Sequence, residues 1–146
     1  MTTVSLTLDE IFDLAKKTLL ANGCDVETAS ILSDLIRNAE RDGSVSHGLF
    51  RLPAYVSGLK SGKINGKGKP EINKVSASVI KVKGNNSLAP VVLSKSLPEL
   101  SKAAKENGVA VLAINNSHHM AAMWPETEKL AEDGFCLLYT SDAADE

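Results

Sequence analysis

The chain has little of several things, and each shortage excludes a class of protein. Among its 146 residues are two cysteines, Cys24 and Cys136, which excludes a cysteine-based zinc site and argues against a disulfide. A formal net charge of −2 lacks the basic excess of surfaces that bind nucleic acid or anionic membranes. No apolar run is long enough to cross a bilayer, and the first residues show no secretory leader. We therefore expect a cytoplasmic protein with neither nucleic acid nor membrane as a partner.

What the chain does have is the patterning of a globular domain, with 43% hydrophobic and 23% charged residues. In its first part, apolar residues recur at helical spacing in three segments. A capping box from Thr7 to Glu10 opens the first segment, and Asp25 can cap the second. The third segment follows Ser46. We expect residues 1–62 to form a helical subdomain.

Strand and helix patterns alternate in residues 63–135. Ile72–Lys83 is rich in β-branched residues and predicts a strand, followed by a turn at Gly84–Asn86. Val109–Ile114 is a continuous apolar run, which suits a strand covered on both faces. Between them, a second capping box at Ser96–Glu99 predicts that a helix begins again there. This order predicts the start of an α/β subdomain.

The end of the chain changes in character. A helix is expected from about Pro125 to Asp133, with the beginning of a strand at Phe135. Residues 136–146 resemble the translation of a sequencing adapter more than a protein terminus, so we expect a truncated reading frame with a non-native tail. The alternative is a short, genuine acidic tail. The predicted fold class is thus α/β, an amino-terminal helical subdomain followed by a truncated α/β subdomain.

A hydroxyl, an imidazole and a guanidinium stand close together in the sequence, at Ser46, His47 and Arg51. If Ser46 caps a helix, His47 and Arg51 share a face that could hold a carboxylate and move a proton. Pro53 disfavours helix at Leu52, so the helix either kinks or begins there. In the second case the three side chains lie on a loop and are merely neighbours.

A second polar cluster, Asn115-Asn116-Ser117-His118-His119, follows the second predicted strand, where α/β folds often place chemistry. Because consecutive side chains of an extended chain point in opposite directions, only one of His118 and His119 can face the site. We place His118 outside it. The sequence Gly66-Lys67-Gly68 is not a dinucleotide fingerprint, because Glu71 stands in place of the third glycine and no strand precedes it.

Together these motifs resemble the amino-terminal part of the type 2 malate/L-lactate dehydrogenase family. The residues that carry the resemblance are Ser46-His47-Gly48 with Arg51-Leu52-Pro53 and Tyr55, Gly108–Val111 with Asn115–His119, and Ala131–Phe135. The resemblance implies a homodimeric oxidoreductase that transfers a hydride between NAD or NADP and a small 2-hydroxy or 2-oxo acid, with a cofactor subdomain that is not of the Rossmann type. It also implies that most cofactor-binding residues lie beyond Phe135, so that this chain alone would be inactive.

The reduction of a 2-oxo acid needs a cation for the carboxylate and an acid for the carbonyl oxygen. Arg51 suits the first task because its planar fork binds carboxylates bidentately. The alternative is a surface arginine paired with Asp42 or Glu40.

The resemblance implies His119 as the acid/base and His47 as the second catalytic histidine, with Ser46 and Arg51 binding the substrate. Trp124 is expected in the core, with the lining of a nicotinamide pocket as an alternative. Two other interpretations of the chain stay open. It is a non-catalytic helical interaction module, or its histidines form a metal site; no H-x-x-x-H spacing supports the latter, and we expect no metal.

Overall fold

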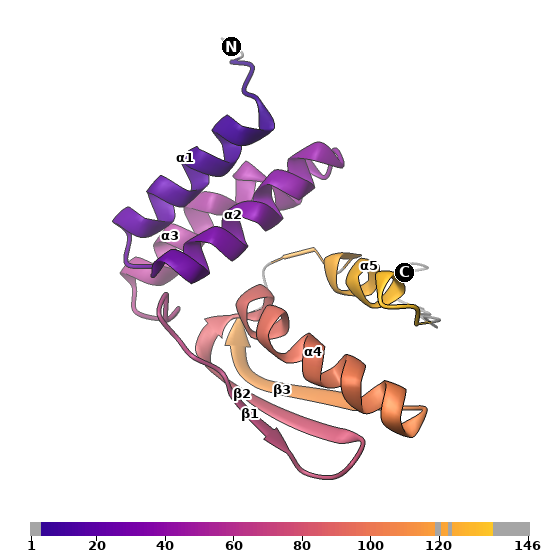
Figure 1. Ribbon diagram of the computed structural model, residues 1–146. Helices are drawn as coiled ribbons and strands as arrows, with labels where there is room; N and C mark the ends of the chain where they lie inside the picture. The colour runs from indigo at the N-terminus through magenta and orange to yellow at the C-terminus, as the bar shows by residue number, and fades with distance from the viewer. Residues whose placement is uncertain (1–3, 119–120, 123, 136–146) are drawn as a thin grey trace, which may run out of the picture.

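A layer of three helices precedes a small three-stranded sheet, with a fourth helix along the sheet and a fifth beyond it (Figure 1). The computed structural model describes residues 4–118, 121–122 and 124–135. In chain order the elements are α1 (Leu8–Ala21), α2 (Val26–Arg41), the 3₁₀ turns η1 (Val45–His47) and η2 (Leu49–Arg51), α3 (Leu52–Lys60), β1 (Glu71–Lys74), β2 (Val79–Leu88), α4 (Ala89–Asn107), β3 (Val111–His118) and α5 (Trp124–Glu132). The predicted fold class, helices followed by a partial α/β unit, is confirmed.

The first two helices begin where the sequence predicts. Thr7 and Glu10 form the capping box, with the Glu10 N–H donating to Thr7 Oγ1 at 3.2 Å and the Thr7 N–H donating to Glu10 Oε2 at 2.8 Å. Asp25 caps α2 by accepting the Thr28 N–H at 2.8 Å. Each cap satisfies backbone donors that the first turn of a helix leaves free.

The third helix begins later than a cap at Ser46 would place it. Ser46 caps no helix; the chain makes two 3₁₀ turns and enters α3 at Leu52, with Pro53 in the first turn. The physical reason is that proline lacks an N–H and fits the start of a helix, where no intrahelical partner is needed. The alternative of a helix that begins at Leu52 is therefore confirmed, and the shared helical face is wrong.

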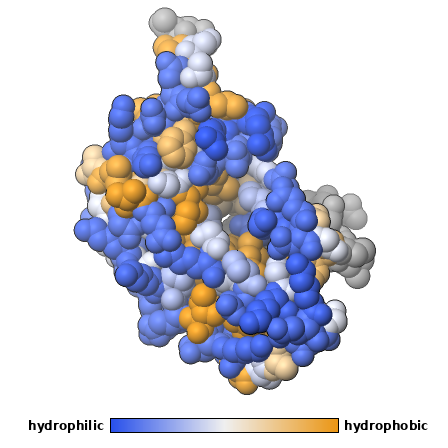
Figure 2. Space-filling view, in the orientation of Figure 1, coloured by the Kyte–Doolittle hydropathy of each residue, from blue (hydrophilic) through white to orange (hydrophobic). Residues whose placement is uncertain are grey.

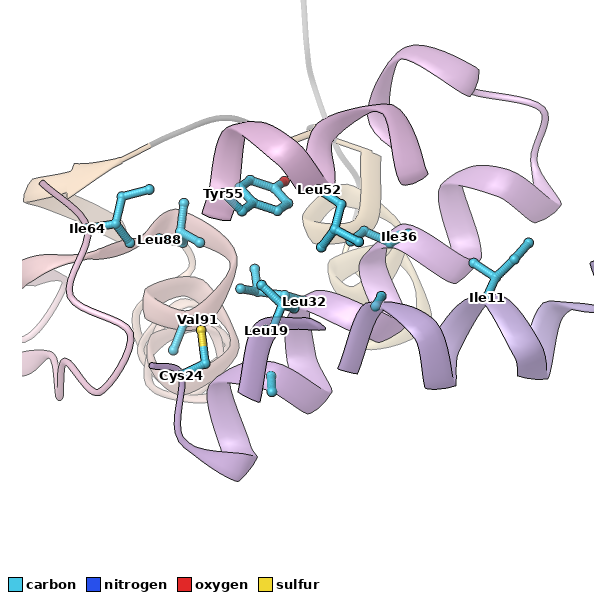
Figure 3. Packing of buried hydrophobic residues seen from close by; sticks show 12 residues of the cluster. Ile11, Leu19, Cys24, Leu32, Ile36, Leu52, Tyr55, Ile64, Leu88 and Val91 are labelled. Atoms are coloured by element: carbon cyan, nitrogen blue, oxygen red, sulfur yellow. The ribbon is translucent and has the colours of Figure 1, made fainter. Parts of the chain in front are cut away.

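The main core joins the helical layer to the sheet. Tyr55 of α3 is fully buried and lies beside Leu52 and above Leu19 and Leu32, with Leu88 on its other side (Figure 3). The cluster as a whole comprises Ile11, Ala15, Leu19, Cys24, Ala29, Leu32, Ile36, Leu52, Tyr55, Ile64, Leu88 and Val91. Residues on both sides of the expected boundary at 62/63 share this cluster, and the boundary itself stays a prediction.

The sheet differs from the predicted one at the first strand. Ile72–Lys83 forms a hairpin, in which β1 and β2 pair antiparallel with Glu71 opposite Lys83. The expected turn at Gly84–Asn86 lies inside β2, where Asn85 and Asn86 adopt φ of 51° and 60° within an irregularity of the β2–β3 pairing. Asparagine favours a left-handed backbone, but here the two asparagines form a bulge within the strand and the chain does not reverse its direction.

The β2–β3 pairing is parallel, and α4 is the connection between the two strands. Leu112 and Ile114 pack against a second cluster of Ile80, Val82, Val92 and Ala103. Val111 is 54% exposed and Ala113 is also exposed, so coverage of both faces of β3 is wrong for the described residues. α4 covers one face only, which leaves β3 with an alternating pattern.

α4 is one continuous helix, so the predicted restart at Ser96 is wrong. Ser96 is buried and its hydroxyl donates to the Val92 carbonyl at 2.8 Å, one helical turn back, instead of capping a new helix. Pro98 lies inside the helix and forfeits one helical hydrogen bond. The buried side chains Val91, Val92, Leu97 and Ala103 hold the helix against its neighbours across this point. In the part of the chain that is described, no helix is long and apolar enough to cross a membrane.

Candidate active site

Hydrogen bonds join Ser46, His47 and Arg51 around the two 3₁₀ turns. Ser46 Oγ lies 2.9 Å from Nδ1 of His47, and Arg51 Nε donates to the Ser46 carbonyl oxygen at 2.7 Å. Ser44 Oγ lies 3.3 Å from the same Nδ1. The structure therefore brings together three of the four side chains expected in the site; the fourth, His119, lies outside the described residues.

One ring nitrogen of His47 is engaged by its own turn. Both hydroxyls contact Nδ1, and because a hydroxyl can donate or accept, the contacts fit either tautomer of the ring. Within the described ranges, no hydrogen bond reaches Nε2 of His47. The half-buried ring thus offers Nε2 to a bound molecule, as a proton donor or acceptor must.

Arg51 forms no ion pair with the carboxylates of the described residues. The alternative pairing with Asp42 or Glu40 is not formed. Asp42 is held by Arg41 instead, with Nε to Oδ1 at 2.7 Å and Nη2 to Oδ2 at 3.0 Å. Arg51 uses Nε on the backbone and keeps its two amino groups for an outside anion.

Glu40 of α2 holds the second 3₁₀ turn in place. Its Oε1 accepts the Leu49 N–H at 2.7 Å. Gly48 lies directly beneath this carboxylate, and a Cβ at position 48 would run into it. Glycine therefore allows the contact, and the contact ties the turn that carries Arg51 to α2.

Tyr55 anchors α3 next to the cation. Burial raises the pKa of Tyr55 to about 12, and the positive charge of Arg51 opposes part of that rise. The guanidinium is therefore close enough to the buried phenol for its charge to be felt there.

Trp124, the first residue of α5, lies against His47. The centroids of the two rings are 6.0 Å apart and the planes cross at 78°, an edge-to-face arrangement. The pKa of the Asp42 carboxyl is lowered chiefly by the hydrogen bond from Arg41, with a smaller contribution from the nearby Trp124 side chain. The half-buried indole thus lies beside the histidine and near the end of α2.

His118 ends β3 and is half-buried, opposite Leu88 of β2. Because His119 is outside the described residues, the assignment of the acid/base to His119 and of an outer role to His118 stays a prediction. Among the residues that the structure describes, no group of three or more His, Cys, Asp or Glu side chains could hold a metal ion.

The described residues do not form a phosphate cradle for a dinucleotide. The β2–α4 junction, a common site for phosphate in α/β folds, reads Leu88-Ala89-Pro90. It has no glycine, and Pro90 removes a backbone donor from the first turn of the helix. We therefore assign none of the described residues to NAD or NADP.

A cavity of about 590 Å³ lies between α2, α4 and α5, where Figure 2 shows the surface hollowed. Its apolar wall includes Ile31, Leu35, Leu93 and Leu97. Ser46, His47 and Arg51 do not line it, so the cavity is separate from the candidate site.

The chain is similar to known proteins over nearly its whole length. The family model described as malate/L-lactate dehydrogenase matches residues 6–145. The chain belongs to this family. Within the family, a Delta(1)-pyrroline-2-carboxylate/Delta(1)-piperideine-2-carboxylate reductase of Pseudomonas syringae pv. tomato is 38% identical over 136 residues, which are 93% of this chain and 40% of the relative.

Solved structures give the same result. The delta1-piperideine-2-carboxylate reductase of Pseudomonas syringae matches with a TM-score of 0.86 and 39% identity, over 90% of this chain and 40% of that one. The malate dehydrogenase of Pyrococcus horikoshii OT3 matches with a TM-score of 0.83 and 29% identity, over 90% of this chain and 38% of that one. The chain therefore spans about 40% of the length of these members of the malate/L-lactate dehydrogenase family.

Sequence reasoning missed Ser44 and named Glu40 and Trp124 only in other roles. Ser44 contacts His47, Glu40 fixes the second turn, and Trp124 packs on the imidazole. Only Gly48 carried a local signal, since a glycine in a polar motif often marks a close approach to the backbone. Nothing in the sequence near Trp124 pointed to a residue as distant as His47.

Proposed function

We propose that this chain carries the carboxylate-binding and proton-transfer group of an NAD(P)-dependent oxidoreductase that acts on a small 2-oxo or cyclic 2-imino acid, or on the corresponding reduced acid. The observation that carries the proposal is the hydrogen-bonded group Ser46–His47–Arg51. It combines a guanidinium that no described carboxylate neutralises with an imidazole whose Nε2 is open.

Arg51 binds the substrate carboxylate. Its Nε is fixed on the Ser46 carbonyl, which orients the planar guanidinium and leaves two amino groups for the two carboxylate oxygens. A carboxylate held in this way places the adjacent C=O or C=N beside the imidazole of the same turn. NADH or NADPH, when bound, supplies the hydride to that carbon.

The histidines handle the proton. As the carbon is reduced, its oxygen or nitrogen takes up a proton, and imidazole can give it in one direction and accept it in the other. Nε2 of His47 is oriented for this by the two serine hydroxyls on Nδ1. We assign the acid/base to His119, with His47 as the second catalytic histidine and Ser46 as a hydrogen-bond partner of substrate and ring.

Relatives support this substrate class. Among the similar proteins, the reductase of Pseudomonas syringae is named for the cyclic 2-imino acids pyrroline-2-carboxylate and piperideine-2-carboxylate, and the dehydrogenase of Pyrococcus horikoshii is named for malate. Both compounds have the reacting carbon next to a carboxylate, which is the arrangement that Arg51 suits. We also propose that the protein acts as a homodimer.

Two experiments test the function. In the first experiment, 15N-labelled chain is titrated with pyruvate, oxaloacetate or Δ1-piperideine-2-carboxylate, and the backbone N–H signal of Arg51 is followed. We expect a saturable shift, which should be lost at the same backbone position in Arg51→Lys because lysine lacks the planar fork. Arg37→Lys is the matched control, since Arg37 is already paired with Asp34 at 2.6 Å.

In the second, residues 6–135 replace the aligned part of the Pseudomonas syringae reductase, and oxidation of NADH or NADPH is measured. Arg51→Lys should raise KM about tenfold or more, since a lost charge-assisted hydrogen bond costs about 1.5–3 kcal/mol. An active Arg51→Lys chimera with an unchanged KM would show that Arg51 does not bind the substrate carboxylate. No shift with any of the three acids, together with an inactive chimera, would favour the interaction module instead.

A further inference from the structure

The imidazole of His47 is held from two directions, and only one of them lies within its own turn. The hydroxyls of Ser44 and Ser46 fix Nδ1, but a pair of hydrogen bonds to one atom still lets the ring plane rotate about them. The ring plane needs a second restraint if Nε2 is to point at a substrate.

Trp124 supplies that restraint. Its ring meets the imidazole edge-to-face, with centroids 6.0 Å apart and planes at 78°. Aromatic pairs prefer this geometry because the positive edge of one ring faces the negative face of the other. A rotation of either ring would lose the contact.

The helix that carries the indole is held at its far end. Asp133, which follows α5, accepts the Ser101 hydroxyl at 2.8 Å, so this end of the helix is tied to α4. At the start of α5, the Trp124 side chain lies near the Asp42 carboxylate, which Arg41 holds through two hydrogen bonds of 2.7 Å and 3.0 Å. The half-buried indole is therefore packed beside His47 and near the end of α2.

We infer that Trp124 is a positioning residue for His47 and that its ring sets the direction in which Nε2 points. The inference rests on the proposed role of His47 in the site and extends that role to a residue that acts through the imidazole.

Charged groups from three elements surround the rings of His47 and Trp124. Arg41 and Asp42 stand at the end of α2, with Glu40 above Gly48. Arg51 belongs to η2, and Glu128 of α5 is close enough to act on Arg41. A pH experiment on His47 therefore needs variants that separate the histidine from these groups.

The first test uses fluorescence of the chain itself, because Trp124 is its single tryptophan. A protonated imidazole in contact with an indole quenches its emission, so acidification should lower the fluorescence intensity of Trp124. His47→Gln should remove most of this quenching, and His118→Gln should keep it. Quenching that persists in full in His47→Gln overturns the inference.

The second test follows the His47 ring by NMR in Trp124→Phe and Trp124→Leu. The His47 Cε1–H signal should move and broaden in Trp124→Leu, and Trp124→Phe should restore part of the wild-type shift because it keeps an aromatic ring. Phe135→Leu, which removes the aromatic partner of Lys105 at the other end of α5, is the matched control and should leave the signal unchanged.

Equal spectra for His47 in wild type and folded Trp124→Leu would refute positioning. Neither test depends on substrate, cofactor or turnover. If both tests fail but the Arg51 signal shifts with an added acid, the positioning role of Trp124 is refuted and the proposed function stands. If both tests succeed but the Arg51 signal does not shift, the positioning role stands and the proposed function is refuted.

Discussion

Glu40 Oε1 accepts the backbone N–H of Leu49 at 2.7 Å, and Gly48 provides the space for that carboxylate. The bond ties the end of α2 to the turn that presents Arg51. Because the site group sits on 3₁₀ turns instead of a helix, few hydrogen bonds of its own backbone hold it, and this side-chain contact takes on that role.

The first prediction concerns this contact. In Gly48→Ala the new methyl displaces the flexible Glu40 side chain and breaks the bond, at a cost of about 1 kcal/mol in unfolding free energy. Glu40→Ala should cost a similar amount, and Glu40→Gln less, because the amide oxygen still accepts. Urea unfolding of the chain measures all three.

The double variant Gly48→Ala/Glu40→Ala completes the cycle. Both single changes remove the same hydrogen bond, so the double variant should be no less stable than Glu40→Ala alone. Additive losses would show that Gly48→Ala acts by another route.

The second prediction is a pH dependence from the cap of α2. The Thr28 N–H is the largest cause that lowers the pKa of Asp25 from its usual 3.8, with smaller contributions from Lys95 and Lys69. A lowered native pKa stabilises the fold above the unfolded value, and this stability is lost as the pH falls below about 3.8. Asp25→Asn keeps a capping oxygen without the charge.

Urea midpoints at about pH 7 and about pH 3 should therefore differ less in Asp25→Asn than in wild type. At the higher pH the variant should be the less stable of the two, because the negative charge at a helix N-terminus is lost. An identical drop in both proteins would contradict the assigned role of Asp25.

The features that could be predicted from the sequence are those that depend on contacts between residues close together in the chain. The capping box at Thr7 and the N-cap at Asp25 use hydrogen bonds across three residues, so the local sequence is enough to predict them. The same spacing at Ser96 misled, because the burial of Ser96 and the packing of α4 favoured one continuous helix over a new start.

The sequence predicted which residues belong to the site, but it did not predict how they are arranged. Ser46, His47 and Arg51 were found because they are close in sequence, and the structure does bring them together. Their support by Glu40 and Trp124 depends on how α2 and α5 pack, which no local pattern encodes. Periodicity likewise could not tell a bulge at Asn85 from a turn, since both use left-handed backbone.

The third prediction is an alkaline transition from Tyr55. Burial raises its pKa to about 12, while an exposed tyrosine ionises near 10. A raised native pKa means that the stabilisation is complete below about pH 10 and is lost as the pH rises toward 12. An absorbance titration of tyrosinate should contain a late phase that Tyr55→Phe removes, and the alkaline loss of stability should be smaller in that variant. A late phase that remains in Tyr55→Phe would assign it to another group.

The last prediction separates the two asparagines of the β2 bulge. Both have left-handed backbone, with φ of 51° at Asn85 and 60° at Asn86, where glycine is favoured. The Asn85 amide donates to the Lys69 carbonyl at 2.9 Å and to Glu71 Oε1 at 3.0 Å, whereas Asn86 is exposed and its backbone oxygen accepts the Asn65 N–H at 2.9 Å.

Asn86→Gly keeps the backbone hydrogen bond to Asn65 and relieves the strain of the left-handed backbone, so its unfolding free energy should stay within about 0.5 kcal/mol of wild type or rise. Asn85→Gly relieves the same strain but loses two side-chain hydrogen bonds, so it should cost about 1 kcal/mol. Thermal or urea unfolding of the pair decides the matter: equal stabilities for the two variants would mean that the Asn85 side chain does not hold the Lys69–Glu71 segment to the sheet.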